Sequence, residues 1–521
     1  MSQSKQAAKS VFIIIIFTIG SKILGFIREA LIAAKFGSGA TTDTFFIALA
    51  ATSLFTAMVT SAINTTSIPV LSEIENIEGK EGKNEHTNNL LNIVMVLSIL
   101  IIALAWFLTP FILKILAYGF EGEQFELAVS MTRIGLFSIF FAGIVGVFRG
   151  YLQSELKFTE SAASQLPFNF VYIFFLIFLT GVFDIKGLMV ASVLAVAAQI
   201  TIQVPGVLKS GFKYRLILDV KDKYIQKILI LVPPILLSVV IGDINSVIDK
   251  ALASTLVEGS ISALNYASRI NALVISIFIT AIITVIFPIF SKEVNKKSLN
   301  GLKKIIINGI NIILLITIPA TVGLIILANP IIKVAFQRGA FDANATYMTS
   351  GALTFYTLGL VGIGSSLLLQ RVYYSLQDMK TPMVNGLIAV GINITFNLIL
   401  IRFMAHKGLA LATSISATTT AGLLLYGLRK KIGPFGFLKS IKCGFKSLAA
   451  SVAMGIIVYF LYNAFEGIIG SSDIYEAVNL FASAGVGALI YFILIYLLRI
   501  EEVNWFIKIV KNRLSIKPKA V

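Results

Sequence analysis

The residues best suited to chemistry in this sequence are ionic side chains that interrupt long apolar runs. Lys22, Arg28 and Glu29 lie in the first such run, and Lys250 and Arg269 lie in two later ones. A charge at bilayer depth costs at least about 2.5 kcal/mol, so residues of this kind usually face a bundle interior or a watery cavity. Two guanidinium groups that line one cavity favour an anionic ligand, because their planar forks match phosphate oxygens in a bidentate way.

Pairing with a neighbouring carboxylate is the alternative to a cavity role for two of these cations. Arg28 is followed directly by Glu29, and Lys250 is preceded directly by Asp249, so each cation has an anion at hand. Arg28 lies in the outer half of its apolar run rather than at its end. We therefore expect Arg28 to line a cavity, and the pairing of Lys250 with Asp249 stays open.

Three arginines differ in their expected depth. Arg269 lies ten residues into its apolar run, which at a rise of 1.5 Å per residue places it about 15 Å down the helix, near mid-membrane. We expect Arg269 to line a cavity as well. Arg133 and Arg371 lie nearer to helix ends, where long side chains reach the water, and we expect that position for them.

The composition is that of a membrane protein. Of the 521 residues, 57% are hydrophobic and 13% are charged, whereas soluble domains carry about 25% charged residues. The single cysteine, Cys443, excludes a disulfide framework. With two histidines in the whole chain, a metal centre built from His and Cys has too few ligands.

Sequence signatures of enzymes are missing. The chain has no GxxxxGK[ST] loop for nucleotide phosphates, no HExxH zinc motif and no GxSxG nucleophile turn. We therefore expect no enzyme activity and no ATP hydrolysis within this chain. Transport would draw on an ion gradient, on the membrane potential or on the supply and removal of the substrate.

Long apolar runs predict an all-α integral membrane protein. Crossing about 30 Å of hydrocarbon as a helix takes roughly 20 apolar residues, and a helix satisfies its own backbone polar groups. Counting such runs predicts fourteen transmembrane helices. They lie at 10–36, 43–70, 89–118, 126–152, 160–182, 186–208, 225–256, 259–290, 302–328, 344–376, 381–404, 408–428, 447–465 and 476–498. The first run continues without a cleavage site, so we expect it to be retained.

The basic residues predict which connections face the cytoplasm. The amino terminus, the even-numbered connections and the carboxyl-terminal tail hold 30 Lys and Arg residues, whereas the odd-numbered connections hold 7. By the positive-inside rule, both termini and the even-numbered connections lie in the cytoplasm. The net charge of +17 is then mostly a matter of topology, and we expect no nucleic-acid partner.

Glycines mark two of the predicted helices. Gly20 and Gly25 in the first helix favour either local unwinding or close helix packing, and both alternatives stay open. Gly143, Gly146 and Gly150 recur along the fourth helix and predict a packing surface.

The chain contains an internal duplication. Three sets of residues recur at offsets of 219 to 222: Ile27 to Leu31 as Ile248 to Leu252, Ile68 to Ser72 as Phe287 to Ser291, and Arg149, Tyr151 and Thr159 as Arg371, Tyr373 and Thr381. Because each offset contains six helices, both copies have the same orientation in the membrane. This predicts two pseudo-symmetric six-helix lobes, at 1–212 and 213–431, followed by a C-terminal helix pair and a cytoplasmic tail at 432–521.

Five short motifs are spread over most of the first twelve predicted helices. They are Lys22 to Glu29, Thr42 to Phe46, Tyr266 to Arg269, Phe336 to Gly339 and Gln377 to Pro382. Together they resemble the motifs of the MurJ/MviN family. Members of that family are lipid II flippases of the multidrug/oligosaccharidyl-lipid/polysaccharide exporter superfamily.

The resemblance implies two lobes around a cationic cavity and a final helix pair that forms a groove for the lipid tail. It implies that Arg28 and Arg269 line the cavity, with Glu29 beside the first. Lys22 and Asp43 belong to the same motifs and are expected to take part in substrate binding. Buttressing of the second lobe is the alternative role for the final helix pair.

The chain departs from the family's pattern at two basic positions. Relatives usually carry an arginine partway down the second helix, whereas residues 51–60 contain none. Lys22 stands where many relatives have an arginine, which keeps the charge but loses the bidentate fork. The cavity is therefore less basic than the family's pattern, and another polyprenyl-linked oligosaccharide is an alternative cargo.

The resemblance also implies a candidate sodium site, since some relatives bind sodium through an aspartate on the seventh helix. Asp249 is the matching residue. Asn393 and Asn397 on the eleventh helix are further candidate ligands, because residues at i and i+4 share a helix face. We expect no other cofactor.

The resemblance predicts a flippase that moves lipid II from the cytoplasmic to the outer leaflet of the bacterial plasma (inner) membrane by alternating access. A cation-coupled drug exporter is one alternative, although such exporters typically have twelve helices. A non-transporting scaffold is another, although a scaffold has little use for Arg28 and Arg269 at depth. We expect a monomer whose partners are an undecaprenyl-pyrophosphate-linked sugar, the lipid bilayer and cell-wall synthesis proteins.

Overall fold

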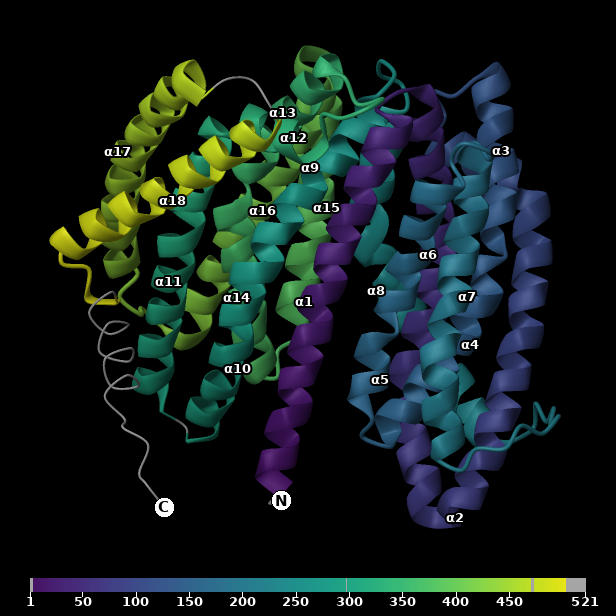
Figure 1. Cartoon of the computed structure of the whole chain (residues 1–521). Helices are drawn as coiled ribbons and strands as arrows, with labels where there is room; N and C mark the ends of the chain where they lie inside the picture. Colours follow the sequence, from purple (N-terminus) through teal and green to yellow (C-terminus); the bar gives the residue numbers. More distant parts are fainter. Residues whose placement is uncertain (1–2, 297, 470–472, 503–521) are drawn as a thin grey trace, which may run out of the picture. The chain divides into compact units, whose positions relative to one another are not determined.

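The computed structural model describes residues 3–296, 298–469 and 473–502, and these residues form helices and turns without any strand (Figure 1). Ten of the helices are long and apolar enough to cross a membrane, or eleven if one bent pair counts as a single span. The all-helical membrane class predicted from the sequence is therefore confirmed. The number fourteen stays a prediction, although each predicted run coincides with one helix, part of one or consecutive helices. The tail residues from 503 onward lie outside the described residues.

The chain divides into two compact units. The first comprises Met1–Ser262 together with Arg338–Asp342, and the second comprises Ala263–Gln337 and Ala343–Val521. These bounds come from the packing of the chain in this structure. The lobe boundaries at 212 and 431 come instead from the internal duplication, and they stay a prediction.

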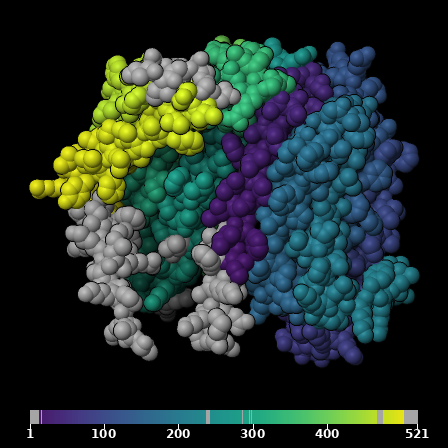
Figure 2. Space-filling view, viewed as in Figure 1, coloured from purple at the N-terminus to yellow at the C-terminus, as the bar shows by residue number. Residues whose placement is uncertain are grey.

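The first unit is a bundle of long and broken helices. It contains α1 (Gln3–Phe36), α2 (Ala40–Leu116), α3 (Gly122–Leu136), α4 (Ser138–Ser154), α5 (Phe158–Ala163), α6 (Gln165–Phe178), α7 (Ile185–Lys209), α8 (Lys223–Ala253) and the start of α9 (Ser260–Val274). In Figure 2, α1 lies along the surface of α5 and α6, the two helices against which it packs. α1 is helical throughout, so Gly20 and Gly25 do not unwind it.

The two predicted spans at 43–70 and 89–118 are the two legs of α2. Helical geometry is broken at Gly79, whose backbone angles are φ 72° and ψ −170°. Close to this bend, Lys83 is fully buried and donates to Glu75 at 2.7 Å and to Glu155 of α4 at 2.6 Å. The buried ammonium also lies 5.1 Å from the ring centre of Tyr151. This ionic cluster ties both legs of α2 to α4.

The glycines of α4 form the packing surface that the sequence predicts. A β-carbon at Gly150 would lie 2.1 Å from Ser67 Oγ, and one at Gly143 would lie 2.7 Å from a methyl group of Val94. α4 thus packs closely against both legs of α2. Packing at this distance is how helices associate in lipid, where apolar burial alone gives little driving force.

The second unit contains the remaining helices. They are the rest of α9, a π-helical turn at Ile275–Ile279, α10 (Thr280–Asn295), α11 (Leu299–Ile326), α12 (Ala328–Phe336), α13 (Ala343–Thr357), α14 (Leu360–Ser375), α15 (Lys380–Met404), α16 (His406–Ile432), α17 (Leu438–Ile469) and α18 (Asp473–Leu497). α17 packs against α11, and α18 crosses α17 obliquely (Figure 1). The predicted run at 344–376 is broken into α13 and α14, which meet at a bend of 45°.

A short loop from late in the chain belongs to the first unit. Ala340 N donates to Ala34 O at 2.8 Å, which holds residues 338–342 against the end of α1. Gly339 has φ +58°, and a β-carbon there would lie 2.3 Å from Ala34 O. Gly37 has φ +68°, and its β-carbon would lie 2.4 Å from Ala340 O. Both positions therefore require glycine, which explains why a glycine ends the motif from Phe336 to Gly339.

We predict that Gly339→Ala destabilises the protein. A residue with a side chain in this backbone region costs about 1–3 kcal/mol, and here the new methyl group also meets a carbonyl oxygen. The melting temperature in detergent should fall by several degrees relative to the unchanged protein. Gly386→Ala in α15 is the matched control, because no atom lies within 4 Å of its β-carbon position. Equal melting temperatures for both variants would contradict this account of the loop.

Candidate functional site

Arg28 lies in a polar and aromatic environment that α1 forms with α6. Its Nη2 donates to Glu29 Oε1 at 2.7 Å, and its Nη1 donates to Asn169 Oδ1 at 3.3 Å. The guanidinium lies 5.0 Å from the ring centre of Tyr172 and 5.5 Å from that of Phe168. Only 15% of the Arg28 side chain is exposed. The pairing with Glu29, which the sequence left as an alternative, is present, and one edge of a largely buried cation is still open to water.

Asn169 orients this arrangement. Its Nδ2 lies 3.2 Å from Ser21 O and 3.0 Å from Gln165 O, so its Oδ1 is turned toward Arg28. The β-carbon position of Gly25 lies 3.8 Å from Asn169 Oδ1, an ordinary van der Waals distance, so Gly25 faces α6 at this contact. Sequence reasoning did not single out Asn169. An asparagine inside the apolar run at 160–182 was the available signal, because polar residues within spans are usually paired or functional.

Lys22 and Glu29 occupy α1 on either side of this contact. Glu29 is 4% exposed, so its carboxylate is a buried counter-charge for Arg28. Lys22 is half-buried, and its ammonium makes no ion pair with any residue that the structure describes. Of the two cations at this contact on α1, Arg28 is neutralised and Lys22 has no fixed anion among the described residues.

Asp43 has a structural task at the start of α9. Its Oδ2 accepts from Gly259 N at 2.7 Å, and its Oδ1 accepts from Ser262 N at 2.7 Å and from Ser262 Oγ at 2.5 Å. The side chain is 3% exposed. Asp43 therefore caps the amino terminus of a helix, a place that favours a carboxylate. Its role in substrate binding stays a prediction.

Arg269 lies on α9 in the second unit. Tyr266, three residues earlier, is fully buried and packs with its ring centre 5.0 Å from that of Phe336. Arg269 is exposed, so this helix presents a buried aromatic ring on one side and a cation on another. The π-helical turn at Ile275–Ile279 follows one to two turns later. Such turns are rare overall, and those that occur are often at functional sites. No sequence pattern predicted this one.

A cavity of about 140 Å³ lies between α2 and α8 in the first unit. Its lining includes small side chains of α2, among them Ala50, Ser53 and Ala57, whereas α8 contributes Asp243 and Lys250. These α2 residues fall in or next to the stretch 51–60 that lacks a basic residue. Lys250 thus supplies a cation from the opposite helix. In the sequence, this lysine stood out mainly as a neighbour of Asp249.

The asparagines proposed as sodium ligands lie together on α15. Asn393 and Asn397 are both buried, and Asn397 Nδ2 donates to Asn393 Oδ1 at 3.0 Å. Asn393 Nδ2 lies 3.5 Å from Thr413 Oγ1 on α16. Asp249 belongs to the first unit, on α8. Within the described ranges, no group of three or more His, Cys, Asp or Glu residues gathers in a way that could hold a metal. A sodium site therefore stays a prediction.

The motif from Gln377 to Pro382 positions α15 rather than a ligand. Asp378 accepts from Lys431 Nζ at 2.6 Å and from Thr381 N at 3.0 Å. These contacts, the one with Lys431 first, lower the pKa of Asp378 to about 2. The carboxylate stays charged at any physiological pH, and it holds the start of α15 beside the end of α16.

Ionic and amide side chains at depth within a bundle of apolar helices define the class of this protein: a polytopic membrane protein with a polar interior. The model of the family described as lipid II flippase MurJ matches residues 32–476. The chain belongs to this family.

Individual relatives agree with the family match over nearly the whole chain. The probable lipid II flippase MurJ of Rickettsia prowazekii (strain Madrid E) is 30% identical over 499 residues, which is 94% of this chain and 98% of that protein. The lipid II flippase MurJ of Burkholderia cenocepacia is 27% identical and covers 80% of this chain and 82% of that protein.

Solved structures give the same result. A lipid II flippase MurJ in an inward closed conformation is similar with a TM-score of 0.77 at 25% identity, covering 94% of this chain and 98% of that one. A multidrug resistance MATE family transporter in an inward-facing conformation is similar with a TM-score of 0.65 at 14% identity, covering 80% and 95%. At that identity, the second likeness shows the fold alone.

Proposed function

We propose that this protein flips lipid II from the cytoplasmic to the outer leaflet of the bacterial inner membrane. The observation that carries the proposal is the match to lipid II flippases over almost the whole length of both chains. The physical requirement for moving such a head group agrees with this proposal. A pyrophosphate-sugar head group cannot cross hydrocarbon alone, and cations on α1, α8 and α9 supply positive charge for it.

The proposed mechanism is alternating access between two six-helix lobes, within a total of fourteen helices. The head group enters an interior that is open to the cytoplasm while the polyprenyl tail stays in lipid, and rocking of the lobes then exposes the head group outside. Each lobe contributes one arginine at depth, Arg28 on α1 and Arg269 on α9. Monomeric action and association with cell-wall synthesis proteins stay predictions.

In this proposal, Arg28 and Arg269 contact the pyrophosphate of the substrate. Glu29 and Asn169 hold the Arg28 guanidinium, so that its remaining donors keep one direction. A guanidinium fixed in this way loses less conformational entropy when it binds phosphate oxygens. Lys22 and Lys250 add positive charge, and Lys250 makes up in part for the cation that α2 lacks.

We predict that this chain supports growth of a cell whose only lipid II flippase is depleted, and that Arg28→Ala and Arg269→Ala abolish this complementation. Loss of one charge-assisted hydrogen bond to phosphate costs about 1.5–3 kcal/mol. The measurement is growth after depletion, with the amount of each variant in the membrane determined by immunoblot.

Arg133→Ala is the matched control. Arg133 lies outside the proposed path, with its guanidinium 5.2 Å from the ring centre of Trp106, and its loss should leave growth intact. Full complementation by both Arg28→Ala and Arg269→Ala at normal expression would exclude the binding role. Failure of the unchanged chain itself would exclude lipid II as the cargo in that cell.

We infer that both termini and the bend of α2 lie in the cytoplasm. The support is the distribution of basic residues between the two sets of connections. In a Cys443→Ser background, Glu123→Cys should react with a membrane-impermeant maleimide in intact cells, whereas Glu81→Cys should react only after lysis. Both positions are exposed. The reverse pattern would overturn the orientation.

We propose that the lipid tail follows an apolar surface of the second unit near its carboxyl end. A cavity of about 340 Å³ is lined by the apolar side chains of Ile286, Ile289, Ile305 and Ile312 on α10 and α11, and its polar lining consists of Lys304 and Asn308 on α11 and of Glu501 and Glu502 beyond α18. α17 also buttresses α11 closely, since a β-carbon at Gly455 would lie 2.5 Å from a methyl group of Ile326. The contact of α17 with α11 supports the buttressing role of the helix pair, whereas its role as a groove for the lipid tail stays a prediction.

We predict that Ile289→Trp slows transport of the lipid-linked substrate but leaves binding of a soluble pyrophosphate-sugar unchanged. Ile289 is 43% exposed at this cavity, so a larger ring obstructs the path without disturbing a core. Flipping of a fluorescent polyprenyl-linked substrate in liposomes gives the rate. Phe403→Trp, at an 80% exposed position of α15, is the control. Equal rates for both variants would refute the tail path.

We further propose that Asn393, Asn397 and Thr413 contribute oxygen ligands to a sodium ion. Amide and hydroxyl oxygens are the hard donors that such an ion prefers, and the three side chains meet between α15 and α16. Sodium should raise the melting temperature of the unchanged protein in detergent but not that of Asn397→Leu. An equal shift with potassium, or with the variant, would exclude the site.

A further inference from the structure

The connection between α7 and α8, residues 210–222, is fixed to α2 by a row of buried asparagines. Asn88 Nδ2 donates to Lys213 O at 2.9 Å, and Asn88 Oδ1 accepts from Arg215 N at 2.8 Å. Asn89 makes the same pair of contacts with the backbone of Asp219, both at 2.8 Å. Asn92 Nδ2 lies 2.9 Å from Ile217 O. We call residues 211–222 the strap.

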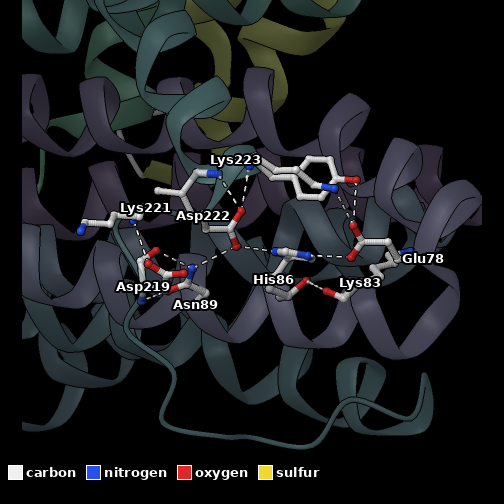
Figure 3. Close-up of polar contacts among 11 residues, drawn as sticks. Glu78, Lys83, His86, Asn89, Asp219, Lys221, Asp222 and Lys223 are labelled. Atoms are coloured by element: carbon white, nitrogen blue, oxygen red, sulfur yellow. Dashed lines mark hydrogen bonds and ion pairs between the residues drawn. The ribbon is translucent and has the colours of Figure 1, made fainter.

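A second group of contacts fixes the end of the strap. Asp222 accepts from His86 and, at 3.2 Å, from Asn89, and the other ring nitrogen of His86 lies 2.8 Å from Glu78 (Figure 3). Both ring nitrogens of His86 thus face carboxylates, one on the strap and one on α2. The acidic side chain of Asp222 is used within the protein, whereas Asp219 is exposed and accepts from Lys221 N at 2.8 Å. The strap therefore exposes three cations and one carboxylate.

The depth of the strap follows from its partners on α2. Asn89 and Asn92 lie at the start of the predicted span 89–118, and the strap itself begins directly after the candidate span Ile185–Lys209. The middle of the strap is therefore held at the level where the bundle enters the membrane. Further along α2, exposed apolar residues such as Val96, Leu97 and Leu100 mark a surface that faces lipid.

The outward side chains of the strap are apolar and basic in alternation. Tyr214, Leu218 and Val220 are 56% to 57% exposed, and Leu216 is 83% exposed. In the printed sequence, Lys213, Arg215 and Lys221 alternate with these residues. None of the three cations forms an ion pair with a residue in the described ranges. Figure 2 shows the strap, in teal, standing out from the helices of the first unit.

We propose that the strap is an interfacial anchor that binds the headgroup layer of an anionic bilayer. Exposed leucine and valine side chains at this level insert at the boundary between headgroups and acyl chains, while Lys213, Arg215 and Lys221 contact lipid phosphates. The asparagine row keeps an extended segment in place without a helix of its own. The anchor goes beyond flipping, since it concerns the lipid around the protein rather than its cargo.

Charge and position indicate which kind of partner covers the strap. Tyr214, Leu216, Leu218 and Val220 are exposed together on one short segment, and contiguous exposed apolar side chains mark a surface that meets a partner or a membrane. A lipid surface fits both the apolar and the basic residues. The apolar side chains insert at the edge of the hydrocarbon, and each basic residue raises the binding constant for an anionic surface about fivefold. A soluble protein docking to the strap is the competing outcome of the test below.

The test places a fluorophore on the strap of the full chain. Leu216→Cys in a Cys443→Ser background carries an environment-sensitive NBD label, and the protein is reconstituted in vesicles of phosphatidylcholine alone or with an equal share of phosphatidylglycerol. Glu81→Cys near the bend of α2 is the water control, and Phe107→Cys, 80% exposed on α2, is the lipid control. We expect emission at position 216 to be shifted to the blue of position 81, and to be quenched by lipids brominated near the headgroup.

The basic residues are tested with the variant Lys213→Gln/Arg215→Gln/Lys221→Gln. It should lose the additional blue shift that phosphatidylglycerol causes, while Lys439→Gln/Lys442→Gln, which replaces two exposed lysines at the start of α17, should keep it. Emission at position 216 equal to that at position 81 in both lipids would overturn the anchor and leave the strap to a soluble partner. An unchanged phosphatidylglycerol effect in the triple variant would overturn the role of the cations. Neither result depends on lipid II transport.

Discussion

Every polar group that this chain takes into hydrocarbon must find its partner within the protein, and the fold follows from that constraint. Helices satisfy the backbone. Within the spans, Arg28 is satisfied by Glu29 and Asn169. Near the bend of α2, outside the predicted spans, the buried Lys83 is paired in the same way with Glu75 and Glu155. A buried charge with a missing partner costs several kcal/mol, so each group fixes the helices that contribute to it.

The same constraint separates polar residues that hold the fold from those that are open to a ligand. Asp43 and Asp378 lie in motifs that resemble those of flippases, yet their oxygens are occupied by helix amino termini and, for Asp378, by Lys431. Arg28 keeps a fraction of its surface open although it is paired, and Lys22 has no fixed anion among the described residues. Motif membership alone does not distinguish these two roles, whereas geometry does.

Much of the architecture could be predicted from the sequence, because apolar runs of about 20 residues leave a chain few alternatives. The all-helical membrane class, the packing glycines of α4 and the shared face of Asn393 and Asn397 are recovered in the structure, whereas the number of fourteen spans stays a prediction. Arg28 pairs with Glu29, which was one of the two alternatives that the sequence left open for this arginine. These features depend on residues that are close along the chain or repeat with a helical period.

The features that sequence reasoning missed depend on residues far apart along the chain. Asn169 meets Arg28 across 141 positions, and Asp43 meets Ser262 across 219. No local sequence pattern predicts such long-range contacts. The break between α13 and α14 is local and coincides with Gly359, a signal that the sequence analysis did not use. The π-helical turn at Ile275–Ile279 is also local, but no proline or glycine marks it.

The asparagine row on α2 has a consequence for biosynthesis. Asn88, Asn89 and Asn92 are buried, yet their backbone partners lie about 125 to 130 positions later in the chain. At a synthesis rate of roughly 5–20 residues per second, these amides wait about 6 to 25 seconds for the partners to emerge. During that interval, the second leg of α2 presents amide groups without intramolecular partners at the membrane surface. In a nascent chain, these amide groups therefore need other hydrogen-bond partners, either water or polar groups of the insertion machinery, until the strap has been synthesised.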